Sequence, residues 1–404
     1  MKTIGLYTLI MLFVILKTPA AVQAQSDTTT LAGIDVLQRD DFAQLRGRKV
    51  GLITNHTGTN RQGESTVGLL SQTPRTELLA LFSPEHGFAG KLDQAKIGDA
   101  TDEESGLKIF SLYGATRVPT TESLSGLDTL VFDIQDIGTR FYTYISTMKG
   151  AMEASAEHGL RFVVLDRPNP IDGIHVQGPV LDAGSESFVG CHTLPVRHGM
   201  TTGEIAEMLK VELSLELDLQ VIPVENWDRR EMFDGTGRLW INPSPNMRSL
   251  TQALLYPGIG LWETTNISVG RGTDTPFERI GAPWMNGVDL ARRLQSEQLP
   301  GIAFVPFEFT PDSSKYANEL CGGVQFMIVD RSTFDPLRTG IAVAVALREL
   351  YPDEWETKSL NRLLSSQAVQ QAILEGRSVD QIVSLYQADL DQFKTRRAKY
   401  LIYR

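Results

Sequence analysis

Five apolar runs, each followed by a cluster of polar residues, constrain the fold of this chain more than any other feature. The runs are KVGLIT before NHTG, TELLALF before SPEHG, LDTLVFDI before QDIGTR, LRFVVLD before RPNP, and LDLQVIPV before ENWD. Nearly continuous apolar runs of this length are typical of parallel strands that helices cover on both faces. The pattern therefore predicts an α/β fold with a doubly wound, Rossmann-like domain over residues 30–255.

Segments with helical character separate these runs. Residues 142–159 end in a glycine suited to a helix C-cap, and residues 201–214 begin with two threonines followed by Glu204, which indicates a helix N-cap. Ligands of doubly wound sheets bind outside the carboxyl ends of the strands. The polar clusters NHTG, PEHG, QDIGTR and DRPNP are all expected at that edge, which makes it the predicted site.

Residues 242–285 differ from what precedes them, because they are rich in Gly, Pro, Asn and Thr and show weak periodicity. Such a stretch is either a disordered linker or a functional loop. Trp262, Phe277 and Trp284 argue against disorder, and the two tryptophans either stack on a ligand ring or belong to the core. Strands are predicted at 302–309 and 324–330, and helices at 334–351 and 379–401. We therefore expect a smaller α+β domain over residues 256–404.

The first 24 residues predict a secretory signal peptide. Lys2 precedes an apolar stretch at 4–16, and a small-residue segment ends at Ala24. That stretch is shorter than the roughly 20 residues of a spanning helix, so no stable membrane anchor is expected after cleavage. Cleavage also removes Lys17 and leaves 36 basic against 49 acidic residues, a net charge of −13. We expect a periplasmic or secreted protein that does not bind nucleic acid.

Cys191 and Cys321 are the only cysteines. An oxidising compartment permits a disulfide between them, but a single pair so far apart in the sequence provides no disulfide framework. Two buried free thiols explain the sequence equally well.

Cofactor motifs are missing from the sequence. GTGRLW, GIGLWE and GRGTDT lack the third glycine of the dinucleotide fingerprint, and there is no Walker A loop, HExxH or GxSxG. No cofactor is predicted. His56, His86 and His198 are candidates to converge with Asp133 or Asp166 on a metal, but none of them has the spacing of a preformed metal site.

The stretch LFSPEHGFAG, residues 81–90, places Glu85 and His86 where an apolar run ends. Pro84 disfavours helix before it and Gly87 permits an unusual turn, so Glu85 is expected at the carboxyl edge of the sheet. A carboxyl group held there and partly shielded from water would suit a general acid. A helix cap or a loop ion pair explains the same residues equally well.

Two further strand ends carry candidate groups. DIQDIGTRFYTY, residues 133–144, supplies carboxylates, an arginine and tyrosines, although an ion pair between Asp136 and Arg140 is an equal explanation. In DRPNP, turn chemistry explains the prolines and the asparagine but hardly Asp166 and Arg167.

Seven motifs follow one another from about residue 48 towards the C-terminus: GLITNHTG, LFSPEHGFAG, DIQDIGTRFYTYISTM, LDRPNP, LPVRHGMTTGEIA, PSPNM and YPGIGLWETTNISVGRGTDTPFERIGAPW. Together they resemble the NamZ exo-β-N-acetylmuramidases. The resemblance implies a glycosidase that removes terminal non-reducing N-acetylmuramic acid from peptidoglycan fragments without a nucleotide. The alternatives are a periplasmic muropeptide-binding protein without catalysis and a metal-dependent hydrolase.

The resemblance also implies that the active site is a cleft between the two domains, which the C-terminal domain closes. It further implies roles for individual residues. Glu85 is the predicted general acid, because PEHG matches the family's motif. The predicted second carboxylate is Asp136 by preference and Glu263 next. The predicted substrate-binding residues are Asn55, His86, Gln135, Arg140, Tyr142, Asp166, Arg167, Asn169, His198, Asn246, Asn266 and Arg271. The three arginines of this set are candidates to pair with the lactyl carboxylate of muramic acid.

Overall fold

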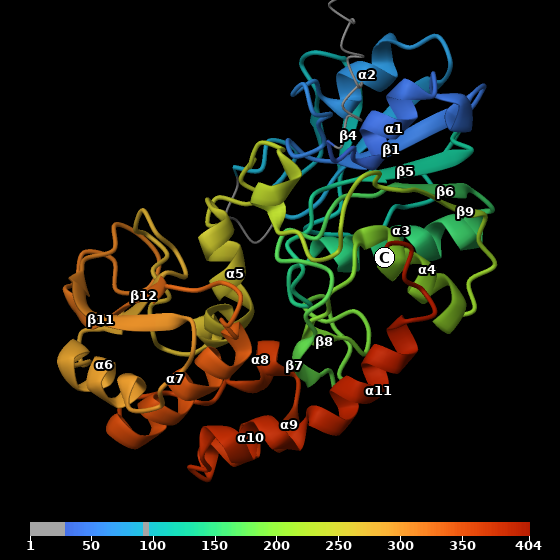
Figure 1. The fold of residues 1–404 in the computed structure, drawn as a ribbon. Helices are drawn as coiled ribbons and strands as arrows, with labels where there is room; N and C mark the ends of the chain where they lie inside the picture. Colours follow the sequence, from blue (N-terminus) through green and yellow to red (C-terminus); the bar gives the residue numbers. More distant parts are fainter. Residues whose placement is uncertain (1–28, 92–96) are drawn as a thin grey trace, which may run out of the picture.

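The computed structural model describes residues 29–91 and 97–404, which form two parts (Figure 1). The first part is built on a seven-stranded sheet and the second on a three-stranded sheet. The predicted signal peptide, residues 1–24, lies outside the described residues. None of the described helices is long and apolar enough to cross a membrane.

The large sheet is parallel except at one edge. Its strands are β1 Lys49–Thr54, β2 Glu77–Ser83, β3 Ala100–Thr101, β4 Lys108–Ser111, β5 Thr129–Asp133, β6 Arg161–Leu165 and β9 Leu219–Ile222. They lie in the order β3-β4-β2-β1-β5-β6-β9, and β3 pairs antiparallel with β4. Apart from β3, this is the 3-2-1-4-5-6 order of a Rossmann fold, with its switch point between β1 and β5. The predicted doubly wound fold is confirmed.

Helices cover both faces of the large sheet. They are α1 Gly33–Arg39, α2 Thr66–Gln72, α3 Tyr144–His158 and α4 Thr202–Glu212. Successive strand residues point to opposite faces. Leu52 of β1 belongs to the core under α1 and α2, whereas Ile53 belongs to the core that contains α3 and α4. This double burial explains why the strands are apolar along almost their whole length.

The ends of two helices follow the predicted capping chemistry. Gly159 ends α3 in a left-handed conformation, with φ 65°. The Thr201 side chain accepts a hydrogen bond from the Glu204 backbone, and the Glu204 carboxylate accepts one from the Thr201 backbone, which forms a capping box before α4.

The second part contains an antiparallel sheet in the order β10-β12-β11. Its strands are β10 Arg279–Ala282, β11 Ile302–Phe309 and β12 Cys321–Ile328. Helix α6 Gly287–Gln295 packs on β11 and β12, and α7 Pro336–Leu350 packs on α6. The smaller elements of the chain are η1 Ala43–Leu45, β7 Gln177–Val180, β8 Pro195–Arg197, η2 Phe233–Thr236, α8 Asn361–Leu364 and α9 Gln367–Leu374.

Residues 242–285 are more regular than the sequence predicts. They contain α5 Leu250–Ile259, η3 Gly260–Thr264 and β10. Helix α5 forms despite Pro257 because it packs tightly on α7, and a Cβ at Gly258 would lie only 1.9 Å from the Pro336 carbonyl oxygen. The Trp262 indole donates to the Gly340 carbonyl at 2.9 Å and is fully buried, so this tryptophan belongs to the core.

The predicted helix 379–401 is two helices, α10 Val379–Leu385 and α11 Gln387–Arg397, which are separated at Tyr386. Helix α11 contacts β7, and the chain beyond it returns to the first part near α4 (Figure 1). The predicted boundary between the two domains, between residues 255 and 256, falls inside α5. These domain limits stay a prediction.

Both cysteines are buried free thiols, so the disulfide that the sequence left open is not formed between Cys191 and Cys321. Burial raises the pKa of each thiol to about 11. Neither thiol therefore has the thiolate character of a reactive cysteine.

Candidate active site

The loop after β2 carries Glu85. Pro84 has no N–H with which to extend the strand ladder. His86 with φ 70° and Gly87 with φ 74° both have left-handed backbone conformations, so the chain turns sharply within PEHG. The turn leaves Glu85 half-buried, where the hydroxyl of Thr143 donates a hydrogen bond to its Oε2 atom.

Glu85 lines a cavity of about 830 Å³ between the two parts of the molecule. Its wall includes residues 85–86, 141–143 and 187–189 of the first part and residues 267–269, 314–315 and 361–363 of the second. Cavities of about 300–1,000 Å³ are usual for small-molecule sites. Because both parts contribute to the wall, the cavity depends on how they pack together.

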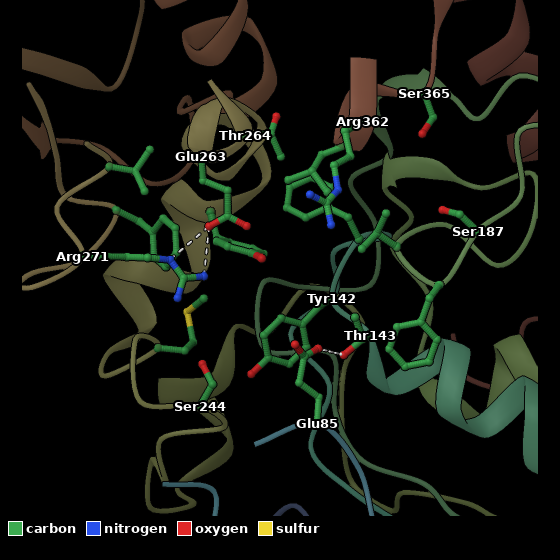
Figure 2. A pocket seen from close by; sticks show the side chains of 18 of the residues that line it. Glu85, Tyr142, Thr143, Ser187, Ser244, Glu263, Thr264, Arg271, Arg362 and Ser365 are labelled. Atoms are coloured by element: carbon green, nitrogen blue, oxygen red, sulfur yellow. Dashed lines mark hydrogen bonds and ion pairs between the residues drawn. The ribbon is translucent and has the colours of Figure 1, made fainter. Parts of the chain in front are cut away.

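Glu263 faces Glu85 from the opposite wall (Figure 2). It lies in η3, and its Oε2 atom accepts hydrogen bonds from Nε and Nη2 of Arg271 at 3.1 and 2.9 Å. Lys315 donates to the backbone carbonyl of Glu263, and burial lowers the pKa of Lys315. One wall thus presents a carboxylate held by a hydroxyl, and the other a carboxylate paired with an arginine.

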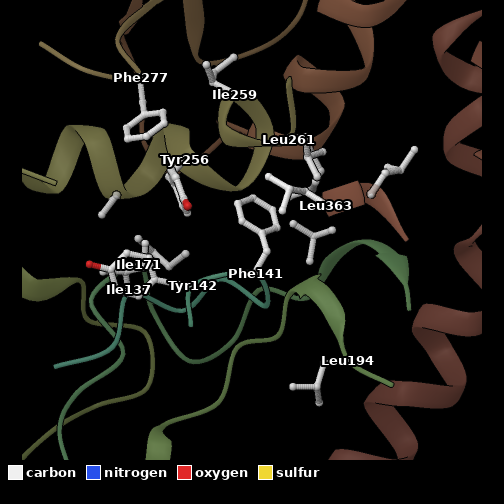
Figure 3. Close-up of a cluster of buried hydrophobic side chains, with 14 of the residues drawn as sticks. Ile137, Phe141, Tyr142, Ile171, Leu194, Tyr256, Ile259, Leu261, Phe277 and Leu363 are labelled. Atoms are coloured by element: carbon white, nitrogen blue, oxygen red, sulfur yellow. The ribbon is translucent and has the colours of Figure 1, made fainter. Parts of the chain in front are cut away.

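Aromatic rings from both parts form an apolar section of the cavity wall (Figure 3). The ring of Tyr256 lies 5.0 Å from Phe141 and 4.6 Å from Phe277, measured between centroids. Tyr142 meets the same tyrosine edge-on at 6.0 Å, and burial raises the pKa of Tyr142 so that its phenol stays protonated at neutral pH. Apolar faces beside polar groups suit the binding of a sugar ring.

The cavity wall contains part of the predicted site. The predicted residues in it are Glu85, His86, Tyr142, Glu263 and Arg271. The other predicted residues do not line this cavity, and their contacts show why.

Arg167 is bound to the end of β5. Its Nε and Nη2 atoms donate to Oδ1 and Oδ2 of Asp133 at 2.6 and 2.9 Å, and Thr66 donates to the same Oδ2 at 2.5 Å. All three residues are buried. This fork-to-fork pair joins the ends of neighbouring strands and leaves no charge of Arg167 for a ligand in the cavity.

Four predicted amides also bond within the protein. The contacts are Asn55 to the Tyr144 hydroxyl at 3.1 Å, Gln135 to the Pro168 carbonyl at 2.9 Å, Asn169 to the Met200 carbonyl at 2.9 Å and Asn266 to the Glu354 carbonyl at 2.8 Å. The fifth, Asn246, is buried and likewise lies outside the cavity wall.

Asp166 is fully buried, and both of its carboxylate oxygens are bonded. The Thr201 hydroxyl donates to Oδ2 at 2.6 Å, and the Gly203 N–H donates to Oδ1 at 2.8 Å. The hydroxyl of Tyr403, in the C-terminal tail, also donates to Oδ2 at 2.5 Å. Burial raises the pKa of Asp166 to about 6. This carboxylate anchors the C-terminus to the first part.

Asp136 is buried beside His198 without a hydrogen bond between the two side chains. Its Oδ2 atom lies 4.0 Å from Nε2 of His198 and accepts from the Gly138 N–H at 2.7 Å. Burial raises the pKa of Asp136 to about 7 and lowers that of His198 to about 3. The neutral ring accepts from the Met200 N–H on Nδ1 and therefore carries its proton on Nε2.

Arg140 is also fully buried and binds backbone carbonyls on both parts of the molecule. Its Nη1 atom donates to Pro179 and Leu194 at 3.0 Å each, and its Nη2 atom donates to Leu363 and Leu364 at 2.8 Å each. Burial lowers the pKa of Arg140 to about 9. The side chain fixes α8 against the first part instead of facing the cavity.

The histidines considered as metal ligands lie in different surroundings. His56 Nε2 is 2.6 Å from the Asn242 carbonyl oxygen, and His198 is buried beside Asp136, away from the cavity wall. Within residues 29–91 and 97–404, no group of three His, Cys, Asp or Glu side chains is placed to hold a metal.

Several cavity residues were not predicted from the sequence. Five of them that bear on the site are Thr143, Arg117, Phe188, Lys315 and Arg362. Thr143 lies within the motif DIQDIGTRFYTY, so this motif is a sequence signal that could have identified its hydroxyl. The others lie outside every quoted motif, and only the tertiary structure brings them to the cavity.

Comparison with known proteins identifies the family. Residues 50–251 match "Exo-beta-N-acetylmuramidase NamZ, N-terminal", and residues 254–403 match its C-terminal counterpart. The chain is 45% identical over 375 residues to the peptidoglycan β-N-acetylmuramidase NamZ of Bacillus subtilis strain 168, which covers 92% of this chain and 91% of that protein.

Two solved structures of DUF1343 family proteins from Bacteroides fragilis share the fold. One has a TM-score of 0.87 at 36% identity and covers 93% of this chain and 100% of that chain. The other has a TM-score of 0.77 at 32% identity and covers 93% and 99%. The chain belongs to the NamZ family of exo-β-N-acetylmuramidases, a family of glycoside hydrolases.

Proposed function

We propose that this chain is an exo-β-N-acetylmuramidase that hydrolyses terminal non-reducing N-acetylmuramic acid from peptidoglycan fragments, with Glu85 as its general acid. The observation that carries the proposal is the pair of carboxylates on opposite walls of one cavity of about 830 Å³. Glycosidases commonly use two carboxyl groups that flank the scissile bond. Glu85 and Glu263 lie on opposite sides of the cavity, and aromatic rings also line it.

In this proposal, Glu85 transfers its proton to the glycosidic oxygen as the bond from that oxygen to the sugar's anomeric carbon breaks. The Thr143 hydroxyl holds one carboxyl oxygen, which orients the other towards the substrate. Glu263 replaces Asp136 as the preferred second carboxylate, because Glu263 lines the cavity and Asp136 is buried beside His198. Glu263 activates the water that adds to the anomeric carbon or stabilises the positive charge that develops there.

The test is release of a monosaccharide from a disaccharide that carries N-acetylmuramic acid at its non-reducing end. We expect N-acetylmuramic acid and the second sugar in equal amounts, with and without EDTA. Binding without cleavage would support a muropeptide-binding protein instead. Activity that EDTA removes and a divalent cation restores would support a metal-dependent hydrolase.

We also propose that the protein acts outside the cytoplasm, in the periplasm or after secretion. This proposal is supported by the order of residues 1–24, in which a charged residue is followed by an apolar stretch and then by a segment of small residues. Sequencing the N-terminus of the exported protein tests this, and a first residue at Gln25 is the expected result.

A further inference from the structure

If the proposed function holds, the residues of the cavity wall indicate which positively charged side chain binds the lactyl carboxylate of the substrate. Of the three arginines that the sequence suggested, Arg140 and Arg167 are buried outside the cavity wall and bind carbonyls or Asp133. Arg271 does line the cavity, but its guanidinium already pairs with Glu263. None of the three presents an uncompensated charge to a ligand.

The other positively charged side chains of the cavity wall differ in the contacts that they already make with the protein. Lys315 donates to the carbonyls of Glu263 and Ile267. The guanidinium of Arg117 lies over the ring of Phe188, 4.3 Å from its centroid. Lys315 therefore has two of its three N–H donors bound to the protein, and one face of the Arg117 guanidinium is covered by a ring.

Arg362 differs from Lys315 and Arg117 in its contacts. Its side chain is exposed and points into the cavity from α8 (Figure 2). Across residues 29–91 and 97–404, its guanidinium makes no hydrogen bond or ion pair. An arginine without a protein partner keeps its full fork of donors for a planar carboxylate.

The backbone beneath this side chain is held firmly. Arg140 donates to the carbonyls of Leu363 and Leu364, the two residues that follow Arg362. The Asn361 side chain accepts from the Ser366 N–H at 2.8 Å, which closes the end of α8. A cation mounted on a fixed backbone loses less conformational freedom when it binds a ligand.

We propose that Arg362 binds the lactyl carboxylate and thereby selects N-acetylmuramic acid over N-acetylglucosamine, which lacks the lactyl group. Arg140 is a positioning residue in this arrangement, because it acts through α8 and does not touch the substrate.

Two ligands test the proposal directly: N-acetylmuramic acid and its lactyl carboxamide, which has the same shape but no charge. Each is measured as a competitive inhibitor of disaccharide hydrolysis by the wild type, Arg362→Gln and Arg362→Lys. We expect the wild type to bind the acid about tenfold to a hundredfold more tightly than the amide, the range of a hydrogen-bonded charge pair. Arg362→Gln should bind both equally, and Arg362→Lys should recover part of the difference.

Arg292→Gln is the matched control, since Arg292 is an exposed arginine on α6 that pairs with Asp289. It should preserve the wild-type ratio between acid and amide. A ratio that Arg362→Gln leaves unchanged overturns the assignment of Arg362, even if the wild type cleaves the disaccharide normally. If the wild type does not cleave the disaccharide, the proposed function itself fails, and direct binding of the two ligands still decides on Arg362.

Discussion

The carboxylates that follow β2 and β5 show two different uses of a polar strand end. Asp133, at the end of β5, is saturated by Arg167 and Thr66 inside the protein. Glu85, just beyond β2, receives one hydrogen bond from a described residue, Thr143, and otherwise faces the cavity. A carboxylate whose oxygens are all bonded by the protein stabilises the fold, whereas one with an open oxygen is available for chemistry.

The largest expected effect is a loss of activity without a loss of stability when Glu85 is changed. Glu85→Gln should lower kcat for disaccharide hydrolysis by about 10²- to 10⁴-fold, the usual contribution of a general acid. The thermal midpoint should stay close to that of the wild type, because the amide oxygen still accepts from Thr143. Initial rates and a thermal melt measure the two quantities.

Glu122→Gln makes the same change at an exposed glutamate outside the cavity and should leave both quantities unchanged. Near-normal turnover by Glu85→Gln would remove Glu85 from the role of acid.

At the end of β5, where Asp133 is fully bonded, we expect a mutation to lower the stability of the fold. Arg167→Ala should lower the free energy of unfolding by about 3–5 kcal/mol, because it leaves the buried Asp133 without its counter-ion. Urea denaturation measures this loss. Arg230→Ala breaks an exposed pair with Asp228 and should leave the free energy of unfolding close to that of the wild type, because water screens exposed charges. Equal losses in the two variants would contradict the distinction.

The two neighbouring buried groups Asp136 and His198 predict that the stability of the fold depends on pH. The folded pKa of Asp136, about 7, lies above the ordinary value of 3.8, so the folded protein binds the extra proton. This stability is fully present below about pH 4 and is lost as the pH rises to about 7. Asp136→Asn should remove that decline, and unfolding measured at several pH values checks it.

His198 acts in the opposite direction, because its lowered pKa destabilises the fold as the pH falls below about 6.5. The variant should retain this acid-side loss. An Asp136→Asn protein with the same pH profile as the wild type would show that the Asp136 carboxyl ionises normally.

The smallest expected effect concerns the C-terminal anchor. Tyr403→Phe removes the hydroxyl that donates to Asp166 and accepts from the Val224 N–H. We expect a loss of about 1–3 kcal/mol in the free energy of unfolding, with kcat unchanged. Tyr400→Phe is the control, since its hydroxyl makes a longer bond of 3.4 Å with Glu212. A fall in kcat for Tyr403→Phe would connect this anchor to catalysis.

The sequence predicted the parallel strands well, because strands buried on both faces must be apolar almost throughout. Residues 49–54 and 302–309 were expected as strands and are β1 and β11. The short β4 was missed, because its four residues are only partly buried and show no long apolar run. Helix α5 was missed because Pro257 and nearby glycines hide its periodicity, while close packing on α7 stabilises it.

The sequence by itself determined the doubly wound sheet, the polar loops at its carboxyl edge and, through the order of its motifs, the family. Only the tertiary structure decided which polar residues the protein uses for itself. Asp166 meets Tyr403 across 237 positions of the chain, and Arg140 reaches Leu364 across 224. Such partners leave no local signal, because a hydrogen bond depends on distance in space and not on spacing along the sequence. For the same reason, only the fold could place Arg362 in the cavity.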